Sequence, residues 1–106
     1  MTVIVQSKTM PVTAALRAFV QQQVGKLTKF SNRISNVRVY LEKIVDKRND
    51  PHASVVKFEV FLPGTRMVVR RHAVDMYEAV VDTTHSMMEQ LRKWKGRRLQ
   101  GRLGWR

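Results

Sequence analysis

Residues 53–74, "ASVVKFEVFLPGTRMVVRRHAV", decide the fold because they predict two strands joined by a tight turn. Apolar residues occupy every second position of the first strand, at Val56, Phe58, Val60 and Leu62. Pro63, Gly64 and Thr65 have the composition of a turn. The segment "RMVVRRHAV" then alternates again, with Met67 and Val69 on the face of Arg71 and with Arg66 and Arg70 on the other face. We therefore expect a hairpin with a basic face on its outer strand.

Two further strands precede this hairpin. Residues 37–45, "VRVYLEKIV", alternate between apolar and polar side chains, and the polar stretch "DKRNDPH" (residues 46–52) separates them from the hairpin. Val37, Val39 and Leu41 share one face of this strand. Near the N-terminus, "TVIVQS" (residues 2–7) is short and rich in β-branched residues, which favours a strand.

Helical spacing appears in two segments. Between Thr13, a suitable N-cap, and Phe30 the apolar residues recur three or four positions apart, at Leu16, Val20, Val24, Leu27 and Phe30. A longer helix is predicted from about Asp75 to a stop at Gly96. Its inward positions are Met76, Val80, Thr83 or Thr84, Met87, Leu91 and Trp94. The order β-α-β-β-β-α predicts an α+β fold, in which two helices pack on one face of a four-stranded, mostly antiparallel sheet.

Length and charge limit the class of protein. The 106 residues fit one small domain, and 20 Lys and Arg against 8 Asp and Glu give a formal net charge of +12. Such a charge attracts polyanions, so nucleic acid is the favoured partner over acidic membranes or proteins. The absence of cysteine excludes disulfides and thiolate metal sites. We find no secretory signal and no apolar stretch near the roughly 20 residues of a membrane span, and we expect a cytoplasmic protein with no membrane contact.

The last residues, "EQLRKWKGRRLQGRLGWR", contain no acid after Glu89 and two tryptophans, Trp94 and Trp105. We expect a domain over residues 1–96 and a basic, flexible tail over residues 97–106. Arginine and tryptophan suit RNA, through phosphate pairing and base stacking. Two alternative roles for this tail remain, a disordered end that improves solubility and a helix that lies on a membrane surface. Its two glycines disfavour the helix.

Several segments, at these distances from one another, resemble the ribosome hibernation promoting factor and ribosome-associated inhibitor family, also known as sigma-54 modulation protein-like. The segments are "PVTAALRAFV", "LTKF", "VRVYLE", "KFEVFLPG", "VDMYEAVVD" and "QLRKWK". The resemblance covers about residues 2–95 and implies a fold similar to a double-stranded-RNA-binding domain.

The resemblance also implies a function. Members of the family bind the small ribosomal subunit at its decoding region, occupy the sites of mRNA and tRNA, and silence translation under stress or in stationary phase. Short members are cytoplasmic, are not enzymes and need no cofactor. Longer members add a C-terminal dimerisation domain that this chain is too short to hold, so whether ribosomes pair when the protein binds stays open. We expect a monomer when free.

Basic positions off the apolar helix stripes are the candidate RNA-binding residues, and the resemblance places family contacts at several of them. The first helix contributes Arg17, Lys26 and Lys29, and the second contributes Arg92, Lys93 and Lys95. The hairpin and the tail add Arg66, Arg70, Arg71, Arg97, Arg98 and Arg102. The alternatives are a solvated helix face and, for the hairpin, charges that discourage edge-to-edge aggregation of the sheet.

The remaining polar residues do not predict a catalytic or metal site. His52, His72 and His85 match no metal-binding spacing, and Asp75 with Glu78 and Asp82 is explained by favourable charge at a helix N-terminus. We therefore expect no enzyme, no metal and no cofactor. A general RNA-binding or RNA-chaperone module without a ribosomal site remains the alternative function. Modulation of a protein such as a sigma factor is a third, which the basic charge disfavours.

Overall fold

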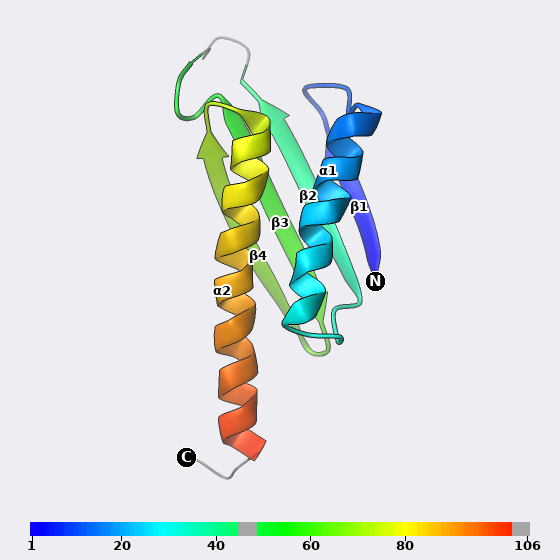
Figure 1. Ribbon diagram of the computed structural model, residues 1–106, viewed down its shortest axis with the longest axis vertical. Helices are drawn as coiled ribbons and strands as arrows, with labels where there is room; N and C mark the ends of the chain where they lie inside the picture. The colour runs from blue at the N-terminus through cyan, green and yellow to red at the C-terminus, as the bar shows by residue number, and fades with distance from the viewer. Residues whose placement is uncertain (45–48, 103–106) are drawn as a thin grey trace.

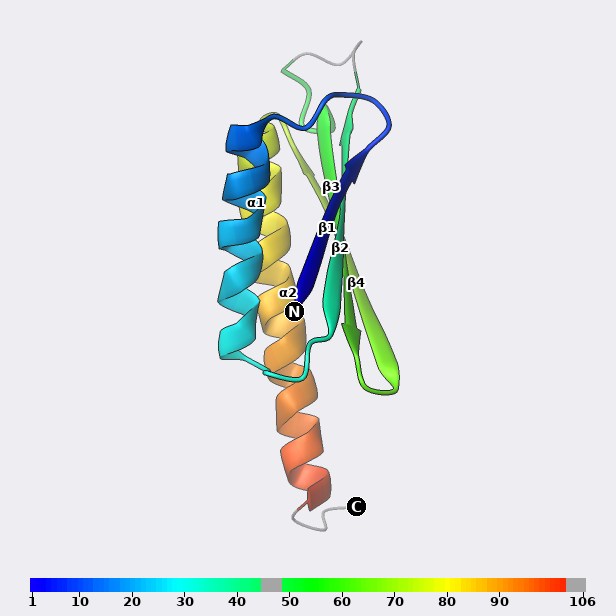
Figure 2. The same ribbon diagram turned by 90° about the vertical axis from the view of Figure 1, so that its right-hand side faces the viewer.

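The computed structural model describes residues 1–44 and 49–102, with side chains as far as Arg97. Its elements follow the order β1 (Thr2–Ser7), α1 (Ala14–Gly25), a 3-10 helix η1 (Lys26–Lys29), β2 (Asn36–Lys43), β3 (Ser54–Leu62), β4 (Thr65–Ala73) and α2 (Met76–Arg102). The predicted α+β order is confirmed. Both helices lie on one face of the sheet, and the other face is left uncovered (Figures 1 and 2).

The four strands pair in the order β1-β2-β3-β4. β1 runs parallel to β2 because α1 crosses over between them, whereas β2, β3 and β4 pair antiparallel. The β3–β4 hairpin closes at the pair Leu62 and Thr65. Between them Gly64 has a φ of 72°, a conformation that glycine adopts without the steric cost of a side chain. This turn fixes the register of every side chain on β4.

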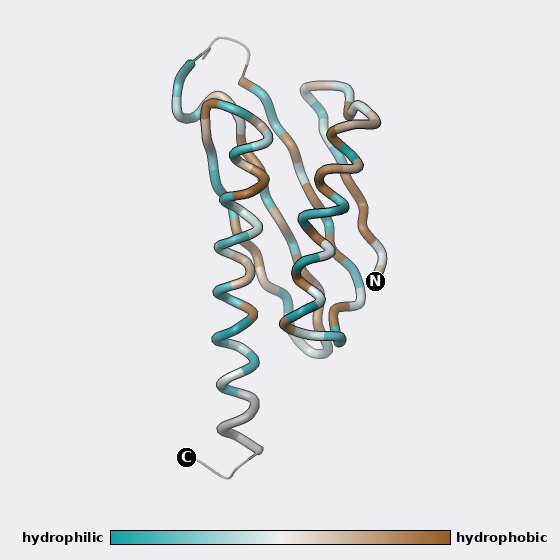
Figure 3. Tube along the Cα trace, viewed as in Figure 1, coloured by the Kyte–Doolittle hydropathy of each residue, from teal (hydrophilic) through white to brown (hydrophobic). Residues whose placement is uncertain are grey.

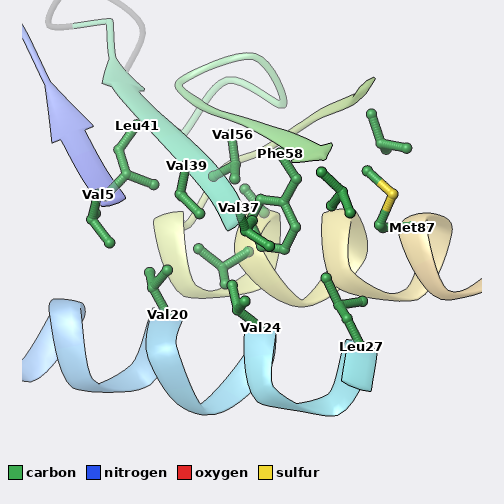
Figure 4. Close-up of a cluster of buried hydrophobic side chains, with 14 of the residues drawn as sticks. Val5, Val20, Val24, Leu27, Val37, Val39, Leu41, Val56, Phe58 and Met87 are labelled. Carbon is green, nitrogen blue, oxygen red and sulfur yellow. The ribbon is translucent and has the colours of Figure 1, made fainter. Parts of the chain in front are cut away.

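The core lies between the sheet and the helices (Figure 4). Val37, Val39 and Phe58 point from the central strands toward Val20 of α1 and Met87 of α2, and all five are completely buried. The predicted inward positions of α2 are confirmed, including both threonines, whose hydroxyls donate to backbone carbonyls one turn earlier. Each fully buried Val, Leu or Phe side chain contributes roughly 1.5–3 kcal/mol to stability.

Side-chain caps define where the helices begin. Thr13 Oγ1 accepts a hydrogen bond from the Leu16 backbone N–H at 3.2 Å, as the sequence predicts. Asp75 Oδ2 accepts one from the Glu78 backbone N–H at 3.3 Å. The first helix is divided, because α1 ends at Gly25 and tightens into η1. Glycine is a weak helix former, and Thr28 Oγ1 donates to the Gly25 carbonyl at 2.7 Å.

The prediction that the second helix stops at Gly96 is wrong, since α2 continues to Arg102. Gly96 has a helical backbone rather than the positive φ of a helix-ending glycine. A single glycine costs a helix only about 1 kcal/mol, and Trp94, Lys95, Arg97 and Leu99 around it tolerate or favour helix. Residues 97–102 of the predicted tail are therefore helical, while Leu103, Trp105 and Arg106 lie outside the described residues. The division into a domain and a tail stays a prediction.

Candidate nucleic-acid interface

Two basic stretches, one in η1 and one in the C-terminal half of α2, lie side by side. α1 and α2 pack side by side and run in the same direction, so η1 lies beside the middle of α2 (Figure 1). A hollow of about 240 Å³ marks this junction and is lined by Phe30, His85, Met88, Glu89 and Arg92. We define the basic helix end as Lys26, Lys29, Arg92, Lys93 and Lys95.

Burial of the apolar stripes turns these cations outward. Leu27 in η1 and Leu91 in α2 are completely buried. Lys26 is half-buried, and the other four members of the basic helix end are exposed. The structure thus brings together five of the six helical residues that the sequence proposes.

The basic helix end contains little compensating negative charge. Glu89 lies 3.6 Å from Arg92, but both side chains are about two-thirds exposed, and such a pair contributes little. Over residues 1–44 and 49–97, none of the four lysines of this group forms an ion pair. The acids of α2 are concentrated near the opposite end of the helix, at Glu78 and Asp82 after the capping Asp75. The surface is therefore polarised along α2, and its positive end faces solvent.

Arg17 is not part of this group. It is exposed on α1, nine residues before Lys26, which corresponds to roughly 13 Å along a helix. It lies toward the N-terminal end of α1, whereas Lys26 and Lys29 belong to η1 after the other end of that helix.

The three hairpin arginines do not form one cluster. Arg71 shares the helix-covered face of β4 with Val69 and Ala73, near the start of α2. Arg66 and Arg70 lie on the opposite, uncovered face, as the alternation predicts. Arg66 is paired there with Glu59 at 2.9 Å.

The C-terminal arginines belong to the last turns of α2. α2 has 27 residues, about 40 Å of helix, and it continues past the end of the sheet (Figure 2). Hydrophilic residues dominate its described turns in this region (Figure 3). Arg97 is exposed there, while Arg98 and Arg102 belong to α2 but their side chains lie outside the description.

A second basic group, which was not predicted from the sequence, lies on the uncovered face of the sheet. Arg38 and Lys57 lie there beside the half-buried rings of Phe61 and Tyr40. The signal was present in the alternation of β2 and β3, because Arg38, Tyr40, Lys57 and Phe61 all occupy positions opposite the core.

Among the described residues, no group of three or more His, Asp or Glu side chains could hold a metal ion. His52 and His72 stack on each other with ring centroids 4.0 Å apart. No helix within the described ranges is both long and apolar enough to cross a membrane.

Known proteins resemble this chain in sequence and in fold. Residues 3–99 match the model of the Sigma 54 modulation protein / S30EA ribosomal protein family. The chain is 30% identical over 91 residues to a ribosome hibernation promotion factor of Deinococcus radiodurans, covering 86% of this chain and 47% of that protein. A ribosome hibernation promotion factor of Lactococcus lactis is 31% identical over 97 residues, covering 88% of this chain and 49% of that protein. The chain thus spans about half the length of these curated relatives.

Solved structures share the fold at lower identity. A ribosomal subunit interface protein from Coxiella burnetii superposes with a TM-score of 0.79 at 23% identity, over 91% of this chain and 99% of that one. The Thermus thermophilus Protein Y N-terminal domain gives 0.75 at 19% identity, over 89% and 99%. These two likenesses support the fold alone, whereas the family match covers nearly the whole chain. The chain therefore belongs to the Sigma 54 modulation protein / S30EA ribosomal protein family.

Proposed function

We propose that this chain is a ribosome hibernation factor that binds the small ribosomal subunit at its decoding region and silences translation under stress or in stationary phase. The observation that carries the proposal is the basic helix end, where two parallel helices present exposed cations with one weakly paired acid among them. The names of the Deinococcus and Lactococcus relatives support a role in ribosome hibernation.

The mechanism that we propose is steric and electrostatic. Lysine and arginine side chains of the basic helix end bind phosphates of ribosomal RNA, and the rigid sheet-and-helix body fixes the position. The bound protein then occupies the space of mRNA and tRNA and competes with both. It acts as a monomer in the cytoplasm, without catalysis and without a cofactor.

Other basic residues have a secondary place in this proposal. Arg97, Arg98 and Arg102 belong to the last turns of α2, and we expect residues 97–106 to extend the RNA contact of the domain. Arg17 and Arg71 lie on the helix side but toward the other end of the molecule. We expect them to contribute less than the basic helix end does.

Co-sedimentation with small ribosomal subunits tests the proposal. The variant Lys26→Glu/Lys29→Glu should lose most of its binding, and added mRNA with initiator tRNA should displace the parent protein. The matched control is Lys8→Glu/Lys43→Glu, which changes the charge equally at exposed positions near the opposite end of the sheet, and it should bind like the parent.

Salt titration provides a second measurement. Counterion release predicts that affinity falls linearly on a log-log plot with salt, by several powers of ten for about six phosphate contacts over a modest range. Saturable binding that mRNA and tRNA do not affect would contradict competition at the decoding region. Weak binding without saturation would leave a general RNA-binding module as the function.

A further inference from the structure

The uncovered face of the sheet carries exposed apolar side chains, which are unusual on a face that only contacts water. Antiparallel sheets with one wet face usually present polar residues there. Here Ile4 on β1 and Val68 on β4 are 37% and 48% exposed, and both belong to one row of paired residues that crosses the sheet. We call this surface the open sheet face. Its central residues are Arg38, Tyr40, Lys57, Glu59, Phe61, Arg66, Val68 and Arg70.

Two aromatic rings on this face each have a cation over the ring, which a stacking base would have to displace or share. The guanidinium carbon of Arg38 lies 5.5 Å from the centroid of the Phe61 ring. The ammonium nitrogen of Lys57 lies 4.5 Å from the centroid of the Tyr40 ring. The rings belong to the two central strands, β2 and β3, and both are half-buried. Each ring is therefore held by the sheet while part of it remains accessible.

Charge on the open sheet face is also one-sided. Four cations surround the two rings, and the acid among them, Glu59, is buried and paired with Arg66 at 2.9 Å. Arg38, Lys57 and Arg70 form no ion pair with any residue that the structure describes. Glu42, two residues after Tyr40 on β2, is a second and exposed acid on this face, so the four cations still outnumber the acids. A partner of this face must therefore be negatively charged and must carry flat apolar groups.

Single-stranded RNA has both properties. Unpaired bases stack on aromatic side chains, and the phosphates between them pair with Lys and Arg. Four-stranded sheets that bind RNA in this way place aromatic residues on an uncovered face with helices behind. In a duplex the base faces are stacked on one another and are not available to such rings.

We propose that the open sheet face binds a segment of single-stranded RNA, whose bases stack on Tyr40 and Phe61. Tyr40 pairs with Lys57, and Phe61 pairs with Asn36, so the rings lie four residues apart along the strands. At about 3.3 Å per residue this is roughly 13 Å, so the two rings hold bases that are not adjacent in the RNA. This site is separate from the basic helix end, and the protein can hold two RNA segments on opposite sides.

Fluorescence anisotropy with a labelled pyrimidine RNA of about ten nucleotides tests this site. Tyr40→Leu and Phe61→Leu each remove a ring but keep an apolar side chain, and each should weaken binding about tenfold or more. Tyr77→Leu is the matched control, because Tyr77 is a 40% exposed ring on the helix side, where it packs against Phe19. It should bind the RNA like the parent.

Two further measurements keep the result interpretable if a ring variant unfolds. Arg38→Gln changes an exposed side chain and should weaken RNA binding severalfold without affecting folding. In the parent protein, NMR resonances of the Tyr40 and Phe61 rings should shift on titration with the oligonucleotide, and those of Phe19 and Tyr77 should not.

The outcomes separate this site from the proposed ribosomal function. If Tyr40→Leu and Phe61→Leu both bind the RNA as tightly as the parent protein, the proposed site is wrong. A protein would then be the partner of the open sheet face. Equal losses of affinity for single-stranded and for duplex RNA in the ring variants would also overturn the site, because stacking on Tyr40 and Phe61 requires unpaired bases. The function proposed above is decided independently, by the Lys26→Glu/Lys29→Glu variant on small subunits.

Discussion

Arg66 and Glu59 form an ion pair across the β3–β4 hairpin, with 2.9 Å between Arg66 Nη1 and Glu59 Oε2. Arg66 is paired in register with Phe61, so the contact runs diagonally from one strand to the next. The Glu59 side chain is only 11% exposed, whereas that of Arg66 is 59% exposed. The arginine therefore compensates a nearly buried carboxylate in the middle of the open sheet face.

The variant Arg66→Ala should lower the free energy of unfolding by about 1 kcal/mol, because Glu59 loses its charged partner while Arg66 itself is largely solvated. The Tyr40 hydroxyl, 3.5 Å from Glu59 Oε1, compensates weakly. Urea denaturation measures the change. Arg66→Lys is the matched control and should recover part of the loss, and an unchanged stability of Arg66→Ala would show that the pair contributes nothing.

Gln23 is a polar residue on the apolar stripe of α1. It is 6% exposed, and its Oε1 accepts no hydrogen bond from the part of the protein that the structure describes. A buried acceptor without a donor costs about 1–3 kcal/mol. Replacing it by a side chain of similar length removes that cost.

We therefore expect Gln23→Met to raise the free energy of unfolding by about 1 kcal/mol in thermal or urea unfolding. Gln22→Met is the control, since Gln22 is exposed on the same helix and the change should have little effect. A loss of stability in Gln23→Met would indicate that the glutamine makes a contact worth more than the desolvation of its oxygen.

Much of this fold follows from periodicity. The alternation of Val37, Val39 and Leu41 and the helical spacing of Leu16, Val20 and Val24 predict which side chains are buried, and all six are. Burial of apolar surface decides these positions, and the sequence displays that surface directly. The Pro63-Gly64 turn likewise predicts the hairpin register.

Contacts between elements are less visible in the sequence. The parallel direction of α1 and α2 brings η1 beside the middle of α2, and no local pattern encodes that arrangement. The cation–ring pairs of Arg38 with Phe61 and Lys57 with Tyr40 depend on the pairing of β2 with β3. The helix end at Gly96 was mispredicted because a local helix-breaking preference of about 1 kcal/mol was outweighed by its neighbours.

Gly96 provides a direct test of the longer helix. A Cβ added at this position would meet no atom within 4 Å, so Gly96→Ala should raise helix content and stabilise the helical backbone around it by about 0.5–1 kcal/mol. Far-UV circular dichroism and amide exchange at Lys95 and Arg97 measure the effect. Gly64→Ala is the contrasting variant and should destabilise the protein, because its φ is 72°. Unchanged helix content and exchange in Gly96→Ala would indicate that α2 ends near this residue.

Arg70 and Arg71 offer a comparison of the two faces of the sheet at neighbouring positions. Both are exposed, but Arg70 lies on the open sheet face and Arg71 on the helix side of β4. Arg70→Gln and Arg71→Gln remove the same charge, so any difference between them reports position rather than net charge. For the pyrimidine RNA, Arg70→Gln should reduce the slope of log affinity against log salt by about 1, as expected when one phosphate contact is lost. Arg71→Gln should leave that slope unchanged, and equal slopes for the two variants would show that the RNA responds to the overall charge and not to the open sheet face.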